Sequence, residues 1–129
     1  MNNMSDEEYE AKCREQRAEQ GFADIDASEI DSWFMEIMPR MLRKFRSINM
    51  SIPCEGSLIS HELCDEDDER LADWNKIIDR MIFLLEEMNE DTCSMDQNRY
   101  SFREIFDYRN ACKDEFFELF SKHFWDLWD

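Results

Sequence analysis

LADWNKIIDRMIFLLEEM, residues 71–88, carries the strongest structural signal in the chain. Its apolar side chains recur at alternating intervals of three and four residues, which places them on one face of an α-helix. These positions are Leu71, Trp74, Ile78, Met81, Leu85 and Met88, and Ile77 and Leu84 widen the same face. The pattern predicts an amphipathic helix over about residues 70–88, with its apolar face turned toward a core.

Two further amphipathic helices are predicted, one on each side of this segment. The upstream helix begins near Asp26 and has apolar residues at helical spacing. These are Ile30, Trp33, Phe34, Ile37, Met41, Phe45 and Ile48. Pro39 lies inside the pattern and removes a backbone donor, so we expect a kink there or two abutting helices. The downstream helix begins at a capping box formed by Ser101 and Glu104, and it could run to residue 129.

Residues 5–20 read as a charged helical arm that precedes these helices. Ser5 and Glu8 match a capping box, and Gly21 is suited to the end of a helix. The predicted organisation is therefore an arm over residues 1–21 and a bundle domain over residues 22–129. The predicted fold class is all-α, a small antiparallel bundle of three main helices with a charged N-terminal helical arm, in which the second helix of the chain, counting the arm, is kinked at Pro39.

The charge balance restricts the partners that this chain can bind. It has 32 acidic and 15 basic residues and a net charge of −17. Such a surface repels phosphate backbones, so direct binding to nucleic acid or to an anionic membrane is disfavoured. It attracts basic surfaces instead, including those that normally hold nucleic acid. The other interpretation is that the charge serves solubility alone.

The cysteines and histidines do not form a recognisable metal or catalytic pattern. Five cysteines are scattered along the chain, and no apolar segment follows a basic start, so we expect free thiols in a reducing cytoplasm. The tightest pair of potential metal ligands is His61 and Cys64, and whether they bind a metal stays open. No nucleophile elbow, phosphate-binding glycine loop or zinc-protease motif occurs. We therefore expect no enzyme activity and no cofactor.

Two groups of carboxylates near the ends of the helix predicted over residues 70–88 are the predicted partner-binding residues. The first group precedes the helix and the second lies near its end. They are Asp65, Glu66, Asp67, Asp68 and Glu69, and then Glu86, Glu87, Glu90 and Asp91. A helix dipole cannot account for five adjacent carboxylates, because they also repel one another. The excess is either tolerated by solvent or used by a partner.

Positive charge accumulates at one place in the sequence. The residues concerned are Arg40, Arg43, Lys44 and Arg46. One interpretation is a site for a phosphate or nucleotide. The other is internal neutralisation, in which the cluster meets Asp126, Asp129 and the chain carboxylate, whose charges are unfavourable at the negative end of the last helix.

Aromatic residues crowd the C-terminal segment and cover more than one helix face. The group consists of Phe116, Phe117, Phe120, Phe124, Trp125 and Trp128. Phe117 and Trp128 cannot share the face of Phe116 in a regular helix. They either pack under another element or form an exposed patch for a partner or a second copy, which makes a homo-oligomer possible through this helix.

Three segments resemble parts of a family of small phage- and prophage-encoded proteins. ELFSKHFWDLWD (residues 118–129) is similar to that family's L-F-A-K-Y-F-x-x-L-W-D tail, although Ser121 and His123 replace its usual Ala and Tyr. DWNKIIDRMIF (residues 73–83) and IMPRMLR (residues 37–43) resemble its W-K-E-I-L-D-K-M-I and I-I-P-x-x-L-R segments. The similarity spans roughly residues 21–129, with a longer acidic insert before Trp74. It implies a helical fold and a phage or mobile-element origin, and it carries over no catalytic residue.

The sequence thus predicts a non-enzymatic, acidic binding protein in the cytoplasm of a bacterial host. Small acidic phage proteins are often inhibitors of host defence, although this is an analogy of lifestyle and size. We expect it to inhibit a nuclease or an RNA-guided defence effector by presenting carboxylates to a channel lined with Lys and Arg. One alternative is an oligomer that sequesters an anionic nucleotide signal at the basic cluster. Another is an accessory to phage structure or assembly.

Overall fold

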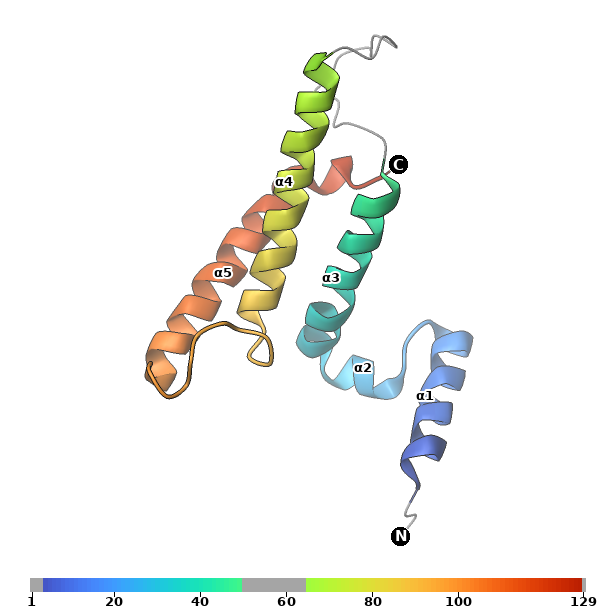
Figure 1. The fold of residues 1–129 in the computed structure, drawn as a ribbon. Helices are drawn as coiled ribbons and strands as arrows, with labels where there is room; N and C mark the ends of the chain where they lie inside the picture. The colour runs from blue at the N-terminus through green and yellow to red at the C-terminus, as the bar shows by residue number, and fades with distance from the viewer. Residues whose placement is uncertain (1–3, 50–64, 129) are drawn as a thin grey trace. The chain divides into compact units, whose positions relative to one another are not determined.

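The computed structural model describes residues 4–49 and 65–128, and of residues 65–68 it describes the backbone only. The described elements are α1 (Asp6–Gln20), α2 (Asp24–Ser28), α3 (Ile30–Ile48), α4 (Asp65–Met88), α5 (Phe102–His123) and the 3₁₀ helix η1 (Phe124–Asp126). No strand occurs within these ranges (Figure 1). The predicted all-α class is therefore confirmed.

The chain divides into two compact units, residues 1–36 and residues 37–129. The division falls within α3, because the first turns of that helix belong with α1 and α2. The predicted boundary after residue 21 does not coincide with it. Each unit is described separately below.

The first unit is held together by a short connection between α1 and α2. Ser5 accepts a hydrogen bond from the backbone of Glu8, and Gly21 ends α1 with a φ of 90°, as the sequence predicts. A positive φ of this size favours glycine, which has no Cβ to clash. Arg17 of α1 then donates two hydrogen bonds, both 3.0 Å long, to the carboxylate of Asp26 in α2.

The core of the second unit lies between α4 and α5, which run side by side in opposite directions (Figure 1). Its largest fully buried side chains are Trp74, Ile78, Met81, Leu84, Leu85 and Phe116. Five of these are positions that the three- and four-residue spacing assigns to the inner face of α4. Phe116 supplies the α5 side of the core, and it stacks on Phe120 at a centroid distance of 5.3 Å. Burial of this apolar area is the main stabilising contribution to the pair.

Trp74 connects three helices of the second unit. Its ring meets Phe45 of α3 edge to face, with centroids 6.5 Å apart, and lies 5.4 Å from the ring of His123 at the end of α5. Further along, Arg46 contacts Asp79 and Arg43 contacts Glu86, so residue numbers rise along α3 while they fall along α4. These contacts are consistent with the predicted antiparallel arrangement of three helices. His123 thus packs against the core through its ring.

The helix boundaries differ from the predicted ones in three places. The break upstream falls at Glu29, between α2 and α3, while α3 is one helix across Pro39, which itself has no backbone N–H to donate. Asp26 does not begin a long helix, because its carboxylate caps the backbone of Ala23 and holds Arg17. Downstream, α5 stops at His123 and continues only as the 3₁₀ turn of η1.

α4 begins at Asp65 and not at residue 70, so the acidic run forms the first turn of the helix instead of a loop before it. Carboxylates at this end are favoured by the helix dipole, which explains the earlier start. The predicted apolar face of α3 is also partly wrong. Met41 and Ile48 are exposed, whereas Leu42 and Pro39 are buried, so the inner face is rotated toward residue 42. None of the described helices is long and apolar enough to cross a bilayer.

Candidate partner-binding surface

The two predicted acidic groups lie at opposite ends of α4. A helix of 24 residues is about 36 Å long, because each residue adds about 1.5 Å. Asp65–Glu69 opens this helix, and Glu86 and Glu87 close it. The structure therefore does not bring the two groups together into one surface. The side chains of residues 65–68 lie outside the described ones, and Glu69 is exposed.

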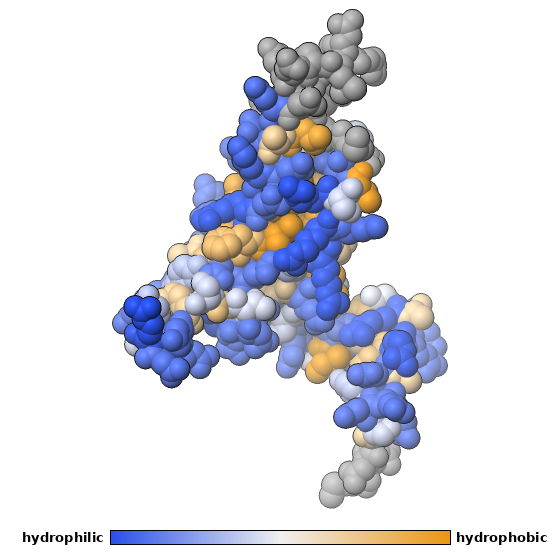
Figure 2. All heavy atoms as spheres, viewed as in Figure 1, coloured by the Kyte–Doolittle hydropathy of each residue, from blue (hydrophilic) through white to orange (hydrophobic). Residues whose placement is uncertain are grey.

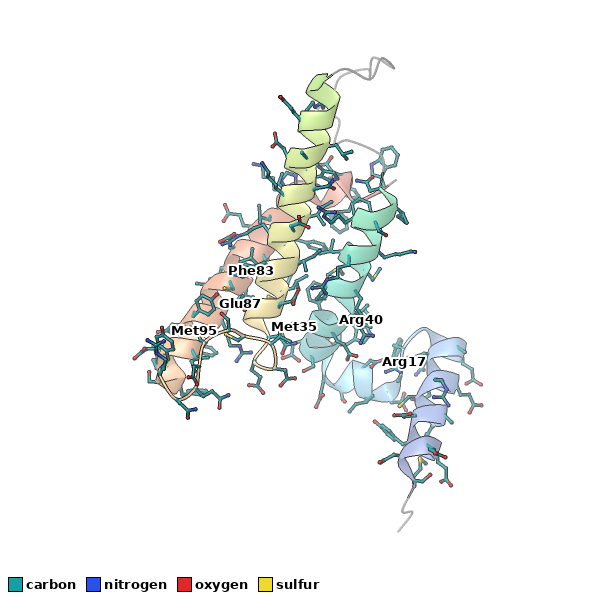
Figure 3. All side chains as sticks on the ribbon, viewed as in Figure 1. Arg17, Met35, Arg40, Phe83, Glu87 and Met95 are labelled. Atoms are coloured by element: carbon teal, nitrogen blue, oxygen red, sulfur yellow. The ribbon has the colours of Figure 1, made fainter. Side chains whose placement is uncertain are left out.

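Glu87 is not a surface carboxylate, which corrects its assignment as a partner-binding residue. It is only 4% exposed and points from α4 toward α5 (Figure 3). It accepts hydrogen bonds from the backbone and hydroxyl of Ser94 and, at 2.6 Å, from the hydroxyl of Tyr108. Burial raises the pKa of Glu87, but these hydrogen bonds outweigh it and bring the pKa below its usual value. The pKa of Tyr108 is raised, first by its hydrogen bond to Glu87 and then by burial.

The other carboxylates of the second group are more accessible but two of them already face cations of the same chain. Glu86 accepts a hydrogen bond from Arg43 of α3. Glu90 lies 3.7 Å from Arg109 of α5, which is an ion pair without a hydrogen bond. Asp91 is exposed in the loop after α4. The second predicted group is therefore largely matched within the chain.

The basic cluster on α3 is partly used for internal neutralisation, with different partners from those predicted. Arg46 donates two hydrogen bonds, 2.6 and 3.2 Å long, to the carboxylate of Asp79, and Arg43 pairs with Glu86. Asp126, one of the predicted partners, instead lies 3.5 Å from Nδ1 of His123. Both Arg residues thus bind α4. Lys44 and Arg40 are exposed on α3. These pairs favour a structural role for Arg43 and Arg46 over an anion pocket.

A third set of carboxylates, which the sequence interpretation did not select, lies on α1. The set consists of Asp6, Glu7, Glu8, Glu10, Glu15 and Glu19, and all are exposed. Within the described residues, none of these side chains makes an ion pair. Hydrophilic side chains predominate on the visible face of α1 (Figure 2). The sequence carries a signal for this set, since acidic residues dominate the composition of residues 6–20.

Three of these carboxylates share one face of α1. Glu8, Glu15 and Glu19 are seven and four residues apart, which places them within about 40° of one another around the helix axis. The rise per residue separates them by about 10 and 6 Å along that face. Cys13, the buried residue of α1, lies on the opposite side. Lys12, four residues after Glu8, lies on the same face, so the arrangement is a row of three carboxylates and one ammonium on the solvent side of a short, capped helix.

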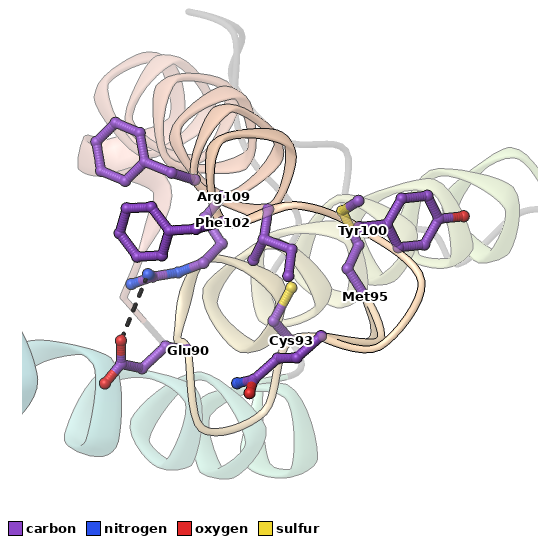
Figure 4. A pocket seen from close by; sticks show the side chains of 9 residues that line it. Glu90, Cys93, Met95, Tyr100, Phe102 and Arg109 are labelled. Atoms are coloured by element: carbon purple, nitrogen blue, oxygen red, sulfur yellow. Dashed lines mark ion pairs between the residues drawn. The ribbon is translucent and has the colours of Figure 1, made fainter.

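An open hollow lies beside the start of α5, under the loop that follows α4 (Figure 4). Its volume is about 330 Å³. The lining is mainly apolar, with one acid and one base at an edge. It consists of Glu90, Cys93, Met95, Gln97, Tyr100, Phe102, Ile105, Phe106 and Arg109. The sequence interpretation missed this site, although Tyr100, Phe102 and Phe106 surround the capping residue Ser101.

The aromatic tail is split between core and surface. Phe116 is fully buried, whereas Phe117, Phe124, Trp125 and Trp128 are exposed to solvent. Phe117 and Trp128, for which the sequence left burial and exposure open, are therefore both exposed and not covered by another element. A group of three potential metal ligands was not found in the described part of the chain. His61 and Cys64 lie outside the described residues.

Comparison of the chain with protein-family models, with curated proteins and with solved structures found no match.

Proposed function

We propose that this chain is a non-enzymatic binding protein that inhibits a host nucleic-acid-binding protein by presenting carboxylates to its basic surface. The observation that carries the proposal is the set of exposed carboxylates on α1, which make no ion pair with the rest of the described chain. Because the net charge is −17, pairing every Lys and Arg internally would still leave a large surplus of carboxylates. The surplus is therefore available to cations of another molecule.

The proposal places the contact mainly on α1 and only secondarily on the ends of α4. A carboxylate that is already matched, such as Glu86, adds little to binding, because its ion pair must be broken first. The unmatched row of Glu8, Glu15 and Glu19 has no such cost. A Lys- or Arg-lined channel that normally binds a phosphate backbone is the complementary surface, and charge of this size also accelerates association. The resemblance to phage-encoded proteins favours a bacterial target, such as a nuclease or an RNA-guided defence effector.

The experiment is to capture partners from a bacterial lysate, to identify them, and to measure the affinity of the purified pair between about 50 and 500 mM salt. We expect affinity to fall steeply with salt, because screening weakens contacts between exposed charges. We also expect double-stranded DNA to compete with the chain for the partner. Affinity that stays constant over this range would exclude carboxylate presentation as the main force.

A further inference from the structure

The hollow beside α5 has an exposed aromatic wall that the fold does not require. Phe102, the first residue of α5, is 82% exposed, and Phe106 one turn later is also exposed. The two rings lie nearly parallel, at 17°, with centroids 6.5 Å apart. Two adjacent exposed rings rimmed by polar residues form a contiguous apolar patch, which is the kind of surface that marks an interaction site. Tyr100 and Met95 line another part of the hollow (Figure 4).

The polar edge of the hollow is an ion pair with spare hydrogen-bonding capacity. The guanidinium of Arg109 is held at this edge, where its Nε donates a 2.8 Å hydrogen bond to the carbonyl of Met88, and its side chain is 22% exposed. Glu90 is 74% exposed and lies 3.7 Å from Arg109, beyond hydrogen-bonding distance. A carboxylate accepts up to about four hydrogen bonds. Glu90 can therefore bind a second donor while it still neutralises Arg109.

We propose that this hollow binds an arginine side chain of the basic partner. In this arrangement the aliphatic stem lies against Ile105 and Met95, the guanidinium stacks on the ring of Phe102, and its N–H groups donate to Glu90. The inference rests on the proposed function, because it assigns one specific contact to the same acidic molecule. The acidic surface by itself attracts any cation. The hollow adds to it one site that selects arginine.

Arginine fits the hollow better than the other candidate groups. Its planar guanidinium stacks on aromatic rings and binds a carboxylate through two donors, whereas the lysine ammonium is a strongly hydrated point charge. An anionic ligand could reach Arg109, but it would meet Glu90 beside it and the net charge of −17 around it. A wholly apolar side chain would leave Glu90 without a new partner.

The test compares three capped octapeptides in which alanine alternates with arginine, with lysine or with glutamate. Affinities for the full-length protein are measured by calorimetry at low and moderate salt. We expect wild type to bind the arginine peptide roughly two- to fivefold more tightly than the lysine peptide, the range for a cation–π contact at an exposed site. Phe102→Leu should remove most of this preference, because it keeps an apolar side chain but loses the ring. Phe83→Leu, a change at an exposed phenylalanine of α4, should retain it.

A second pair of variants tests the carboxylate. Glu90→Gln should weaken the arginine peptide more than Glu118→Gln does, although both changes remove one charge. Equal affinity for the two cationic peptides, with normal salt dependence, would overturn the arginine site and leave the proposed function standing. If neither cationic peptide binds, the result would count against the arginine site and against the proposed function. Tighter binding of the glutamate peptide would overturn the inference in favour of an anion site at Arg109.

Discussion

Tyr108 donates a 2.6 Å hydrogen bond to the carboxylate of Glu87 and thereby ties the second turn of α5 to the last turn of α4. Ser94 binds the same carboxylate through its backbone and its hydroxyl, so the loop between the helices shares the attachment. The neighbours of Ser94, Cys93 and Met95, line the hollow. One buried acid therefore positions both the helix pair and a wall of the candidate binding site.

Removal of the Tyr108 hydroxyl should destabilise the second unit. Tyr108→Phe leaves the buried Glu87 carboxylate with one hydrogen bond fewer, and we expect a loss of about 1–3 kcal/mol in the free energy of unfolding. Urea denaturation at pH 7 measures this loss. Tyr100→Phe is the control, because its hydroxyl is not bonded to Glu87, and it should change stability by less than about 0.5 kcal/mol. Equal effects of the two changes would contradict the role assigned to Tyr108.

Glu87 should also make stability depend on pH. Its pKa in the folded protein lies below the ordinary value of 4.5, so the unfolded chain binds the proton more readily. The stabilisation is fully present above pH 4.5 and is lost as pH falls through the lowered pKa. Glu87→Gln should therefore lose less stability than wild type between about pH 5 and pH 3, whatever its stability at pH 7.

Comparing the pH dependence of stability in wild type and Glu87→Gln isolates the contribution of Glu87, because the other carboxylates become protonated in the same way in both proteins. Hydrogen bonds from Arg17 and Arg80 lower the pKa values of Asp26 and Glu115, and these contribute with the same sign in wild type and variant. The readout is the free energy of unfolding in urea at successive pH values. Parallel curves for the two proteins would show that Glu87 has the same pKa folded and unfolded.

The ion pair between Arg46 and Asp79, in which Arg46 donates both hydrogen bonds, should contribute little to the free energy that holds α3 against α4. Both side chains are about half exposed, and such pairs contribute about 0.2–1 kcal/mol. A double-mutant cycle with Arg46→Ala and Asp79→Ala measures the coupling free energy, which should fall toward zero in about 1 M NaCl. A coupling above about 2 kcal/mol, or one that salt leaves unchanged, would contradict this prediction.

Neutralising the carboxylate row on α1 should weaken partner binding. We expect the triple variant Glu8→Gln, Glu15→Gln, Glu19→Gln to bind the captured partner at least about tenfold more weakly at 50 mM salt. It should also show a smaller dependence of affinity on salt, since fewer charges participate.

The control for this variant has the same net charge but different positions. It replaces Asp79, Asp107 and Glu115 with Asn, Asn and Gln, three carboxylates that already pair with Arg side chains of this chain. Equal losses of affinity in the two triple variants would show that total charge matters and that the row on α1 does not.

The sequence predicted the helices well where a local signal, either apolar spacing or a capping residue, is enough to determine the structure. The spacing in residues 71–88 identified the buried face of α4, and Ser5, Gly21 and Ser101 marked helix ends because capping depends on a few local atoms. The break at Glu29 was missed because it depends on Asp26 binding Arg17 of another helix. The early start of α4 was missed because acidic residues suit both a loop and a first turn.

The partner-binding residues were predicted less well than the helices, because their state also depends on contacts with other elements. Composition shows that carboxylates are in surplus, but it does not show which of them are already matched. Glu87 and Asp91 are both acidic residues near the end of one helix, yet one is buried among donors and the other is exposed. The hollow depends on the path of the loop between α4 and α5, which no periodic pattern describes.

The burial of Trp74 beside the exposure of Trp125 and Trp128 gives the protein a built-in optical probe of its own core. In a Trp33→Phe variant, which removes the half-buried fourth indole, acrylamide, a neutral quencher that is not repelled by an acidic surface, reaches the two exposed indoles and leaves the fluorescence of Trp74 in place. The emission that survives at high acrylamide therefore reports on the junction of α3, α4 and α5, and a red shift of that residual emission marks the moment when water enters it.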